Sequence, residues 1–191
     1  MLTTTDAIVL SLQPHSDKAH VLHAYTRAGG RINYMVYGLG RKNAAGLYTP
    51  LSLLQITTDK TSIRTAQLSF VPTSITTDPY KRTVALFLSE VLYHTLRHPM
   101  TDEPMFEYLD EAIRLLDAET EPQDFHLRFL IGLAERLGFA IDEAEHPELL
   151  RVPQSRNERQ EQLRRLCTYF DEHIDTWKAP RSLEVLTEVF D

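Results

Sequence analysis

Residues 18–37 read KAHVLHAYTRAGGRINYMVY, and they hold the clearest structural signal in the sequence. More apolar and more polar side chains alternate along Lys18–Thr26 and again along Arg31–Tyr37. Both runs are rich in β-branched and aromatic residues. The Ala28-Gly29-Gly30 sequence between the two runs supplies a turn. Alternation with a period of two on both sides of a glycine turn predicts a β-hairpin.

Further strand signals lie on either side of this hairpin. They cover residues 7–13, 50–58 and 62–71, and Pro14-His15-Ser16-Asp17 is expected to end the first of these strands. No segment between them has a helical period long enough for a β-α-β unit. Five of the seven glycines lie between positions 29 and 46, where a small barrel needs tight bends. Five short strands in succession therefore predict a closed β-barrel.

A helical period replaces the strand pattern after Asp78-Pro79. Prolines at positions 104, 122 and 180 stand where a first helical turn tolerates them, and Gly138 is expected to cap the third helix. The apolar faces of the predicted helices lie within residues 84–95, 109–116, 125–137, 163–174 and 183–190. We therefore expect an α+β multi-domain chain, with a five-stranded barrel domain at residues 1–78 and an α-helical bundle domain at residues 79–191.

The charge divides at the same place as the predicted structure. Residues 1–82 contain nine Lys/Arg and four Asp/Glu, a net charge of +5, whereas residues 83–191 contain eleven Lys/Arg and twenty-three Asp/Glu, a net charge of −12. Depletion of glutamate in strands explains why none precedes Glu90, but it leaves the excess of Lys and Arg over Asp unexplained. A basic first half indicates nucleic acid or another acidic surface as a partner.

Composition excludes several classes of protein. Of the 191 residues, 42% are hydrophobic and 25% are charged, which is typical of a globular chain. No run approaches eighteen apolar residues, and the first twelve residues lack the pattern of a secretory signal, so we expect a cytosolic protein without a membrane partner. The single cysteine, Cys167, excludes an intramolecular disulfide and a multi-cysteine zinc site.

No motif predicts catalysis, so we expect a protein that is not an enzyme and has no cofactor, metal or small-molecule substrate. Residues 38–42, GLGRK, lack the spacing of a phosphate-binding loop. His94 and His98 have a spacing suited to one metal ion, but no third ligand is indicated and surface or partly buried histidines are the better interpretation. The acidic residues of the second half follow the polar face of the bundle. Cys167 lies in an apolar stripe and is interpreted as a buried, unreactive thiol.

The outward face of the barrel has the residue types that bind single-stranded nucleic acid. On the second strand of the hairpin, Ile32, Tyr34 and Val36 form the more apolar face and are expected to point into the core. The opposite face and the following loop then present cations for phosphates and an aromatic ring for a base. The candidate DNA-binding residues are Arg27, Arg31, Tyr37, Arg41 and Lys42.

The order of motifs resembles that of the RecO family of bacterial DNA repair and recombination mediators. Each motif is short, and their order and spacing along most of the chain carry the resemblance. The stretches that carry it are Ala7–Leu10, Tyr25–Ile32 (YTRAGGRI), Tyr37–Lys42 (YGLGRK), Pro50–Leu54 (PLSLL), Phe129–Phe139 (FLIGLAERLGF) and Arg181–Phe190 (RSLEVLTEVF).

This resemblance implies an N-terminal OB-fold that binds single- and double-stranded DNA, followed by an α-helical domain. It also implies RecR and the acidic C-terminal tail of single-stranded DNA-binding protein as partners. The implied role is to load RecA onto coated single strands and to anneal complementary strands, without bond chemistry, in the cytoplasm at the nucleoid.

Two departures from the family pattern stand out, and two other functions stay open. Many family members carry a four-cysteine zinc module after the equivalent of Phe139, whereas this chain has only Cys167, and the stretch from Phe139 to Arg156 is short for the family. The first alternative is a non-catalytic protein-interaction scaffold whose OB-fold no longer binds DNA. The second is a hydrolase or nuclease that would need a metal at His94 or His98.

Overall fold

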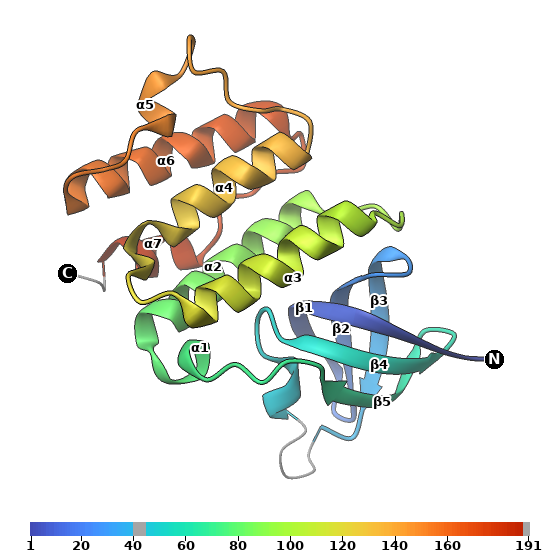
Figure 1. Ribbon diagram of the computed structural model, residues 1–191. Coiled ribbons are helices and arrows are strands. Elements are labelled where there is room, and N and C mark those ends of the chain that lie inside the picture. The colour runs from blue at the N-terminus through green and yellow to red at the C-terminus, as the bar shows by residue number, and fades with distance from the viewer. Residues whose placement is uncertain (40–44, 189–191) are drawn as a thin grey trace.

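The computed structural model describes residues 1–39 and 45–188, and it shows a closed five-stranded barrel followed by a group of helices (Figure 1). The barrel order is β1-β2-β3-β5-β4, with β4 pairing back onto β1. This confirms the predicted class, an N-terminal OB-fold barrel with an α-helical part after it. The strands are β1 (Leu2–Ser16), β2 (Ala19–Thr26), β3 (Gly30–Tyr37), β4 (Leu53–Asp59) and β5 (Ser62–Leu68).

The hairpin predicted from residues 18–37 is formed by β2 and β3. Leu22 pairs with Tyr34 and His23 with Asn33, so the inward and outward faces of the two strands coincide. Leu22 and Tyr34 are buried in the barrel core, whereas the side chain of Tyr37 is 60% exposed. The assignment of Tyr34 to the core and Tyr37 to the outside is therefore confirmed.

The first strand is longer than the sequence predicts. Pro14-His15-Ser16-Asp17 is expected to end it, but β1 continues to Ser16, and Pro14 pairs with His20 of β2. The pairing shifts register between Pro14 and Ser16. Such a bulge accommodates a proline because the missing N–H is not needed for the ladder there. The turn thus lies at residues 17–18.

Capping residues mark several of the helix ends. The Asp78 carboxylate accepts hydrogen bonds from the N–H groups of Tyr80 and Lys81, and Asp102 accepts one from Met105. Gly138 has a φ of +90° and follows the helix that it is expected to cap. The helices are α1 (Ser74–Thr77), α2 (Pro79–Thr95), α3 (Glu103–Ala118), α4 (Phe125–Arg136), α5 (Pro147–Leu150), α6 (Arg156–His173) and α7 (Ser182–Glu188), with short 3₁₀ turns at Ala45–Tyr48 and Pro122–Asp124.

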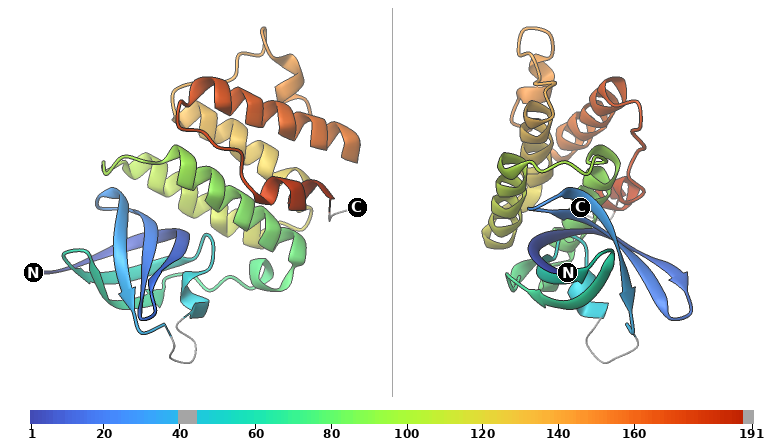
Figure 2. Two further views of the ribbon diagram at one scale, coloured as in Figure 1. Left: turned by 180° about the vertical axis from the view of Figure 1, so that it is seen from behind. Right: turned by 90° about the vertical axis from the view of Figure 1, so that its right-hand side faces the viewer.

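The helices form two layers on one side of the barrel. In the views of Figure 2, α2 and α3 lie next to the strands, and α4 and α6 lie beyond them. The outward side chains of Ile8 and Leu10 on β1 and of Tyr25 on β2 belong to the same apolar core as α2 and α3. Burial of these side chains fixes the barrel against the helices. The domain division at residue 78 stays a prediction.

Within the described residues, no helix has both the length and the apolar composition to cross a lipid bilayer.

Candidate nucleic-acid interface

The turn of the β2–β3 hairpin packs against the segment that links α2 to α3. The backbone N–H of Arg31 donates to the carbonyl oxygen of His98 at 3.2 Å. Gly30 has a φ of +63°, and a β-carbon at this position would lie 2.2 Å from the carbonyl oxygen of Met100. Glycine is therefore required by both the backbone conformation and the space available. The turn serves as a contact between barrel and helices as well as a strand connection.

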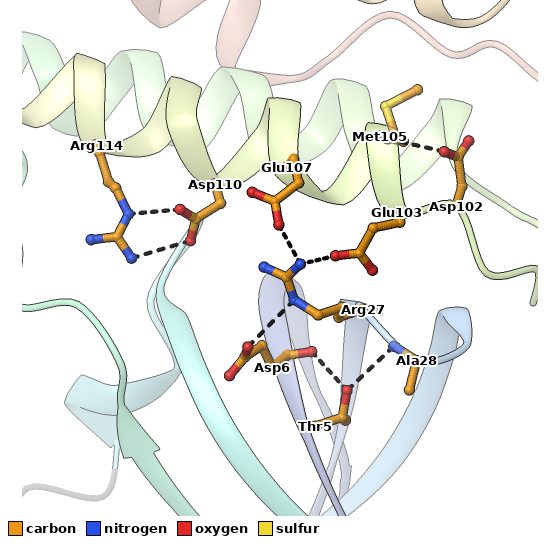
Figure 3. Close-up of polar contacts among 10 residues, drawn as sticks. All are labelled: Thr5, Asp6, Arg27, Ala28, Asp102, Glu103, Met105, Glu107, Asp110 and Arg114. Atoms are coloured by element: carbon orange, nitrogen blue, oxygen red, sulfur yellow. Dashed lines mark hydrogen bonds and ion pairs between the residues drawn. The ribbon is translucent and has the colours of Figure 1, made fainter.

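Arg27 lies in a cluster of acidic residues at this contact (Figure 3). Its guanidinium pairs with Asp6 at 3.4 Å and with Glu103 and Glu107 of α3, and it covers the Phe106 ring at 4.4 Å. The hydrogen bond to Glu107 is the main cause that raises the pKa of Arg27. Three carboxylates around one cation leave a locally negative surface, which does not attract phosphates. The expectation that Arg27 contacts DNA stays a prediction.

Arg31 leaves the barrel interior, as predicted, but its guanidinium is partly covered by the end of α2. It lies 4.4 Å from the centroid of the Tyr93 ring, and its Nη1 donates to the carbonyl oxygens of Tyr93 and Leu96 at 3.2 and 3.3 Å. A cation at the carboxyl end of a helix interacts favourably with the helix dipole. Burial lowers the pKa of Arg31, and the positive charge of Arg97 adds to this effect. Arg31 thus joins the two parts of the protein.

Tyr37 stands at the far end of β3 from this contact. Its exposed ring is followed by Gly38, which has a φ of +74° and no atom within 4 Å of the position that a β-carbon would take. Arg41 and Lys42, the remaining candidates for DNA binding, lie outside the described residues. The outward face of β3 therefore carries Arg31 near the helices and Tyr37 at the other end of the strand.

The candidates for catalysis do not form a site in the described part of the chain. His94 is in α2, His98 lies beyond its end, and no group of three or more His, Cys, Asp or Glu residues that could hold a metal ion occurs among residues 1–39 and 45–188. Cys167 is buried in α6, as predicted, and burial raises the pKa of its thiol to about 12. A thiol that stays protonated is a poor nucleophile.

A hollow surface lies between α3 and α4. This α3–α4 groove has a volume of about 620 Å³, and its lining includes Leu115, whose side chain is 54% exposed. Arg114 and Arg128 also line the groove, paired with Asp110 and Glu119 respectively. An exposed apolar surface of this kind fits the apolar side chains of a peptide.

Sequence reasoning missed Tyr93 and Arg97, which lie beside Arg31. The edge of the Tyr93 ring meets His23 at a centroid distance of 5.1 Å, and its face meets the Arg31 guanidinium. Tyr93 lies outside the apolar stripe of α2 and close to the end of that helix. An aromatic residue at such a position was the signal in the sequence that could have indicated a contact there. Arg97 has no comparable signal, because Arg31 and Arg97 are far apart in the sequence and come together only through the packing of α2 against β3.

A closed five-stranded barrel with an exposed aromatic side chain on β3 belongs to the OB-fold class, whose members bind oligonucleotides or oligosaccharides. The family models for the recombination protein O N-terminal and C-terminal domains match residues 1–78 and 76–149. The chain belongs to the RecO family.

Several curated relatives are similar to this chain, and each is named DNA repair protein RecO. The relative from Christiangramia forsetii is 25% identical over 238 aligned positions that cover all of both chains. Those from Phocaeicola vulgatus and Bacteroides fragilis are 32% and 37% identical over 78% and 72% of this chain, and the matches cover 66% and 61% of the relatives. Because 238 positions exceed the 191 residues here, the C. forsetii protein has residues without a counterpart in this chain.

Proposed function

We propose that the protein is a recombination mediator in DNA repair that binds single- and double-stranded DNA through its barrel. The observation that carries this proposal is the outward face of β3, where the exposed Tyr37 ring precedes the basic residues Arg41 and Lys42 in the sequence. The names of the relatives support the role in repair. The net charge of −12 on residues 83–191 favours DNA on the barrel side, because like charges repel.

The proposed mechanism is phosphate neutralisation combined with base stacking. Arg41 and Lys42 would pair with phosphates, and a base would stack on the Tyr37 ring, as single-strand-binding proteins combine a cationic path with aromatic platforms. Arg31 lies on the same face of β3, six residues before Tyr37. A phosphate path along this face would therefore lead from the basic segment towards the helices.

We further propose the partners and processes that the family relationship supports. These are RecR and the C-terminal tail of single-stranded DNA-binding protein as partners, and RecA loading and strand annealing as processes. The protein would act in the cytoplasm at the nucleoid and would catalyse no bond chemistry. The alternative is a scaffold whose barrel does not bind DNA, and the measurement below separates the two functions.

Binding to fluorescein-labelled oligo-dT is expected to weaken steeply with salt. If about four to six phosphates are contacted, log K should fall against log salt with a slope of roughly −3 to −4. Replacing both Arg41 and Lys42 by alanine should reduce the magnitude of this slope by about 1.4, and Tyr37→Ala should weaken binding roughly 5-fold or more without changing the slope. Fluorescence anisotropy over a salt series measures all three quantities.

The matched control is the Arg164→Ala/Arg165→Ala double variant. These residues are also exposed cations, but they belong to α6, which lies beyond α2 and α3 and away from the barrel (Figure 2). Removing them changes the net charge by the same amount and should leave the slope nearly unchanged. A slope near zero for the folded wild-type protein would reject the electrostatic mechanism and favour the scaffold function.

The α3–α4 groove fits the proposed contact with the acidic protein tail. Leu115→Glu places a negative charge on the apolar floor and should weaken binding of a labelled peptide with that tail sequence at least about 10-fold, while oligo-dT binding stays unchanged. The control is Val152→Glu, the same type of change at an exposed apolar residue outside the groove. Equal binding of the peptide by both variants would exclude the groove as its site.

A further inference from the structure

Two cavities meet at Tyr93, where the barrel joins the helices. The smaller has a volume of about 400 Å³ and lies between the outward faces of β2 and β3 and the end of α2. The larger, of about 720 Å³, lies between β1, α2 and the segment that precedes α7. Tyr93 lines both of them. We refer to the smaller cavity as the junction cavity, and its lining residues are His23, Arg31, Asn33, Tyr93, Arg97 and Pro99.

The junction cavity carries positive charge that no carboxylate in the described structure neutralises. Arg31 and Arg97 both line it, and no Asp or Glu is among its lining residues. Neither arginine forms an ion pair with a described carboxylate, in contrast to Arg27 with its three acidic partners. Two adjacent guanidinium groups without a counter-ion repel each other, and a bound anion would remove this cost.

The same wall contains nitrogen atoms that have no hydrogen-bond partner. The Nε of Arg31 and the Nε2 of His23 are buried and unpaired among the described residues, and the His23 side chain is 9% exposed. Nδ1 of His23 is 2.7 Å from the Asn33 amide oxygen, so the orientation of the ring is fixed. Buried polar atoms are normally satisfied. The Nε–H of Arg31 is a donor that an anion would satisfy, whereas Nε2 of His23 is an acceptor while Nδ1 donates to Asn33, and a water would satisfy it.

The positive surface continues into the larger cavity. Lys178 and Arg181 line that cavity together with His94, whose Nδ1 is also buried and unpaired. The carboxylate there, Glu90, accepts hydrogen bonds from the N–H and the hydroxyl of Ser182 at 2.9 and 2.6 Å. Glu90 keeps its negative charge in these hydrogen bonds, but it is one carboxylate beside two cations, Lys178 and Arg181, and it does not line the junction cavity.

We propose that the junction cavity binds a backbone phosphate of single-stranded DNA, between Arg31 and Arg97. This inference rests on the proposed function and extends it, because it takes the DNA from the outward face of β3 onto the helical part. Arg31 and Tyr37 belong to the same face of β3, and at roughly 3.3 Å per residue they are about 20 Å apart. A DNA strand along this face would have its base stack at one end and its phosphate contact at the other.

The geometry favours a phosphodiester over an acidic peptide in this cavity. The cavity adjoins the strand face that carries Tyr37, and its lining contributes an aromatic ring, two guanidiniums and an amide but no aliphatic side chain apart from Pro99. Arginine forks fit phosphate oxygens with paired hydrogen bonds. A peptide tail would also need an apolar pocket, and the α3–α4 groove provides one.

The test is charge reversal at Arg97, because this residue is exposed and lies outside the strands. Arg97→Glu should weaken oligo-dT binding at least about 10-fold, and Arg97→Ala should lower the magnitude of the salt slope by about 0.7. Arg97→Lys keeps the charge and should bind within about 3-fold of the wild type. The matched control is Arg82→Glu at the other end of α2, an exposed arginine that lines neither cavity.

The outcomes separate this inference from the proposed function. Wild-type binding that is lost in Arg97→Glu but kept in Arg82→Glu supports the phosphate site. Equal weakening by both reversals, or none by either, overturns the site while DNA binding by the barrel stands. If the wild type itself does not bind, both proposals fail. If Arg97→Glu loses binding to a labelled glutamate-rich peptide but keeps oligo-dT binding, the cavity is a protein-docking site and the inference is overturned. Circular dichroism melts confirm that each variant is folded.

Discussion

Gly30→Ala is expected to lower the free energy of unfolding by about 3 kcal/mol or more. This is a large loss for a substitution that adds only one methyl group. Two costs combine at this position. The φ of +63° is unfavourable by about 1–2 kcal/mol for a residue with a β-carbon, and the added carbon would meet the backbone of Met100, which cannot rotate away. Relief requires the hairpin to separate from the segment between α2 and α3.

The matched control for this substitution is Gly38→Ala. Gly38 has a similar φ of +74°, but no atom lies within 4 Å of the position that a β-carbon would take. Its substitution should therefore cost only the same backbone contribution of about 1–2 kcal/mol. Urea denaturation at constant m-value compares the two variants. Equal losses for Gly30→Ala and Gly38→Ala would show that the contact with Met100 contributes nothing.

The second large effect is a loss of stability in mild acid, caused by His126. Its side chain in α4 is 2% exposed, its ring meets the edge of Phe87 at a centroid distance of 6.3 Å, and burial lowers its pKa to about 3. The native imidazole is therefore neutral, whereas in the unfolded chain it takes up a proton below pH 6.5. The contribution of neutral His126 to the free energy of unfolding is therefore complete above that pH. It falls as the pH decreases, and the loss is about 2 kcal/mol at pH 5.

His126→Phe removes the titrating group and keeps an aromatic ring against Phe87. The decrease in unfolding free energy between pH 7 and pH 5 should be about 2 kcal/mol smaller in this variant than in the wild type. His23 and His94, whose pKa values are also lowered by burial, contribute to the pH dependence of the variant and of the wild type alike. The difference between the two proteins therefore isolates the contribution of His126. The exposed His15→Gln serves as a control and should keep the wild-type pH dependence. An unchanged dependence in His126→Phe would contradict the assignment.

The proposed DNA face and the contact between barrel and helices share one hairpin. Arg27 and Arg31 flank its turn, and the structure engages both with α2 and α3. Tyr37 lies at the opposite end of β3 and is open to solvent. Substitutions at Arg27 or Arg31 would therefore change the fit of the helices as well as any DNA contact, and Tyr37 and Arg97 are the more informative positions.

The elements and their faces followed from the sequence alone because they depend on local periodicity. A period of two and a glycine turn are properties of neighbouring residues, so the β2–β3 hairpin and the inward position of Tyr34 were predictable. The helix starts were predictable for the same reason, since Asp78 and Asp102 cap the residues that directly follow them. The extent of β1 was not, because its pairing with β2 carries the strand past Pro14.

The roles of individual charges depend on how the helices pack against the barrel. In the sequence, Arg27 and Arg31 cannot be told apart by their surroundings, because they are two arginines on either side of one glycine turn. The fold places Arg27 among carboxylates that are 76 and 80 residues away in the chain, and Arg31 beside Arg97 without one. Electrostatic interactions depend on distance in space, and a local pattern holds no information about charges that meet through packing. The residue types needed for a DNA-binding barrel were therefore readable from the sequence, whereas the packing of the helices on the barrel determined which cations remained without a partner.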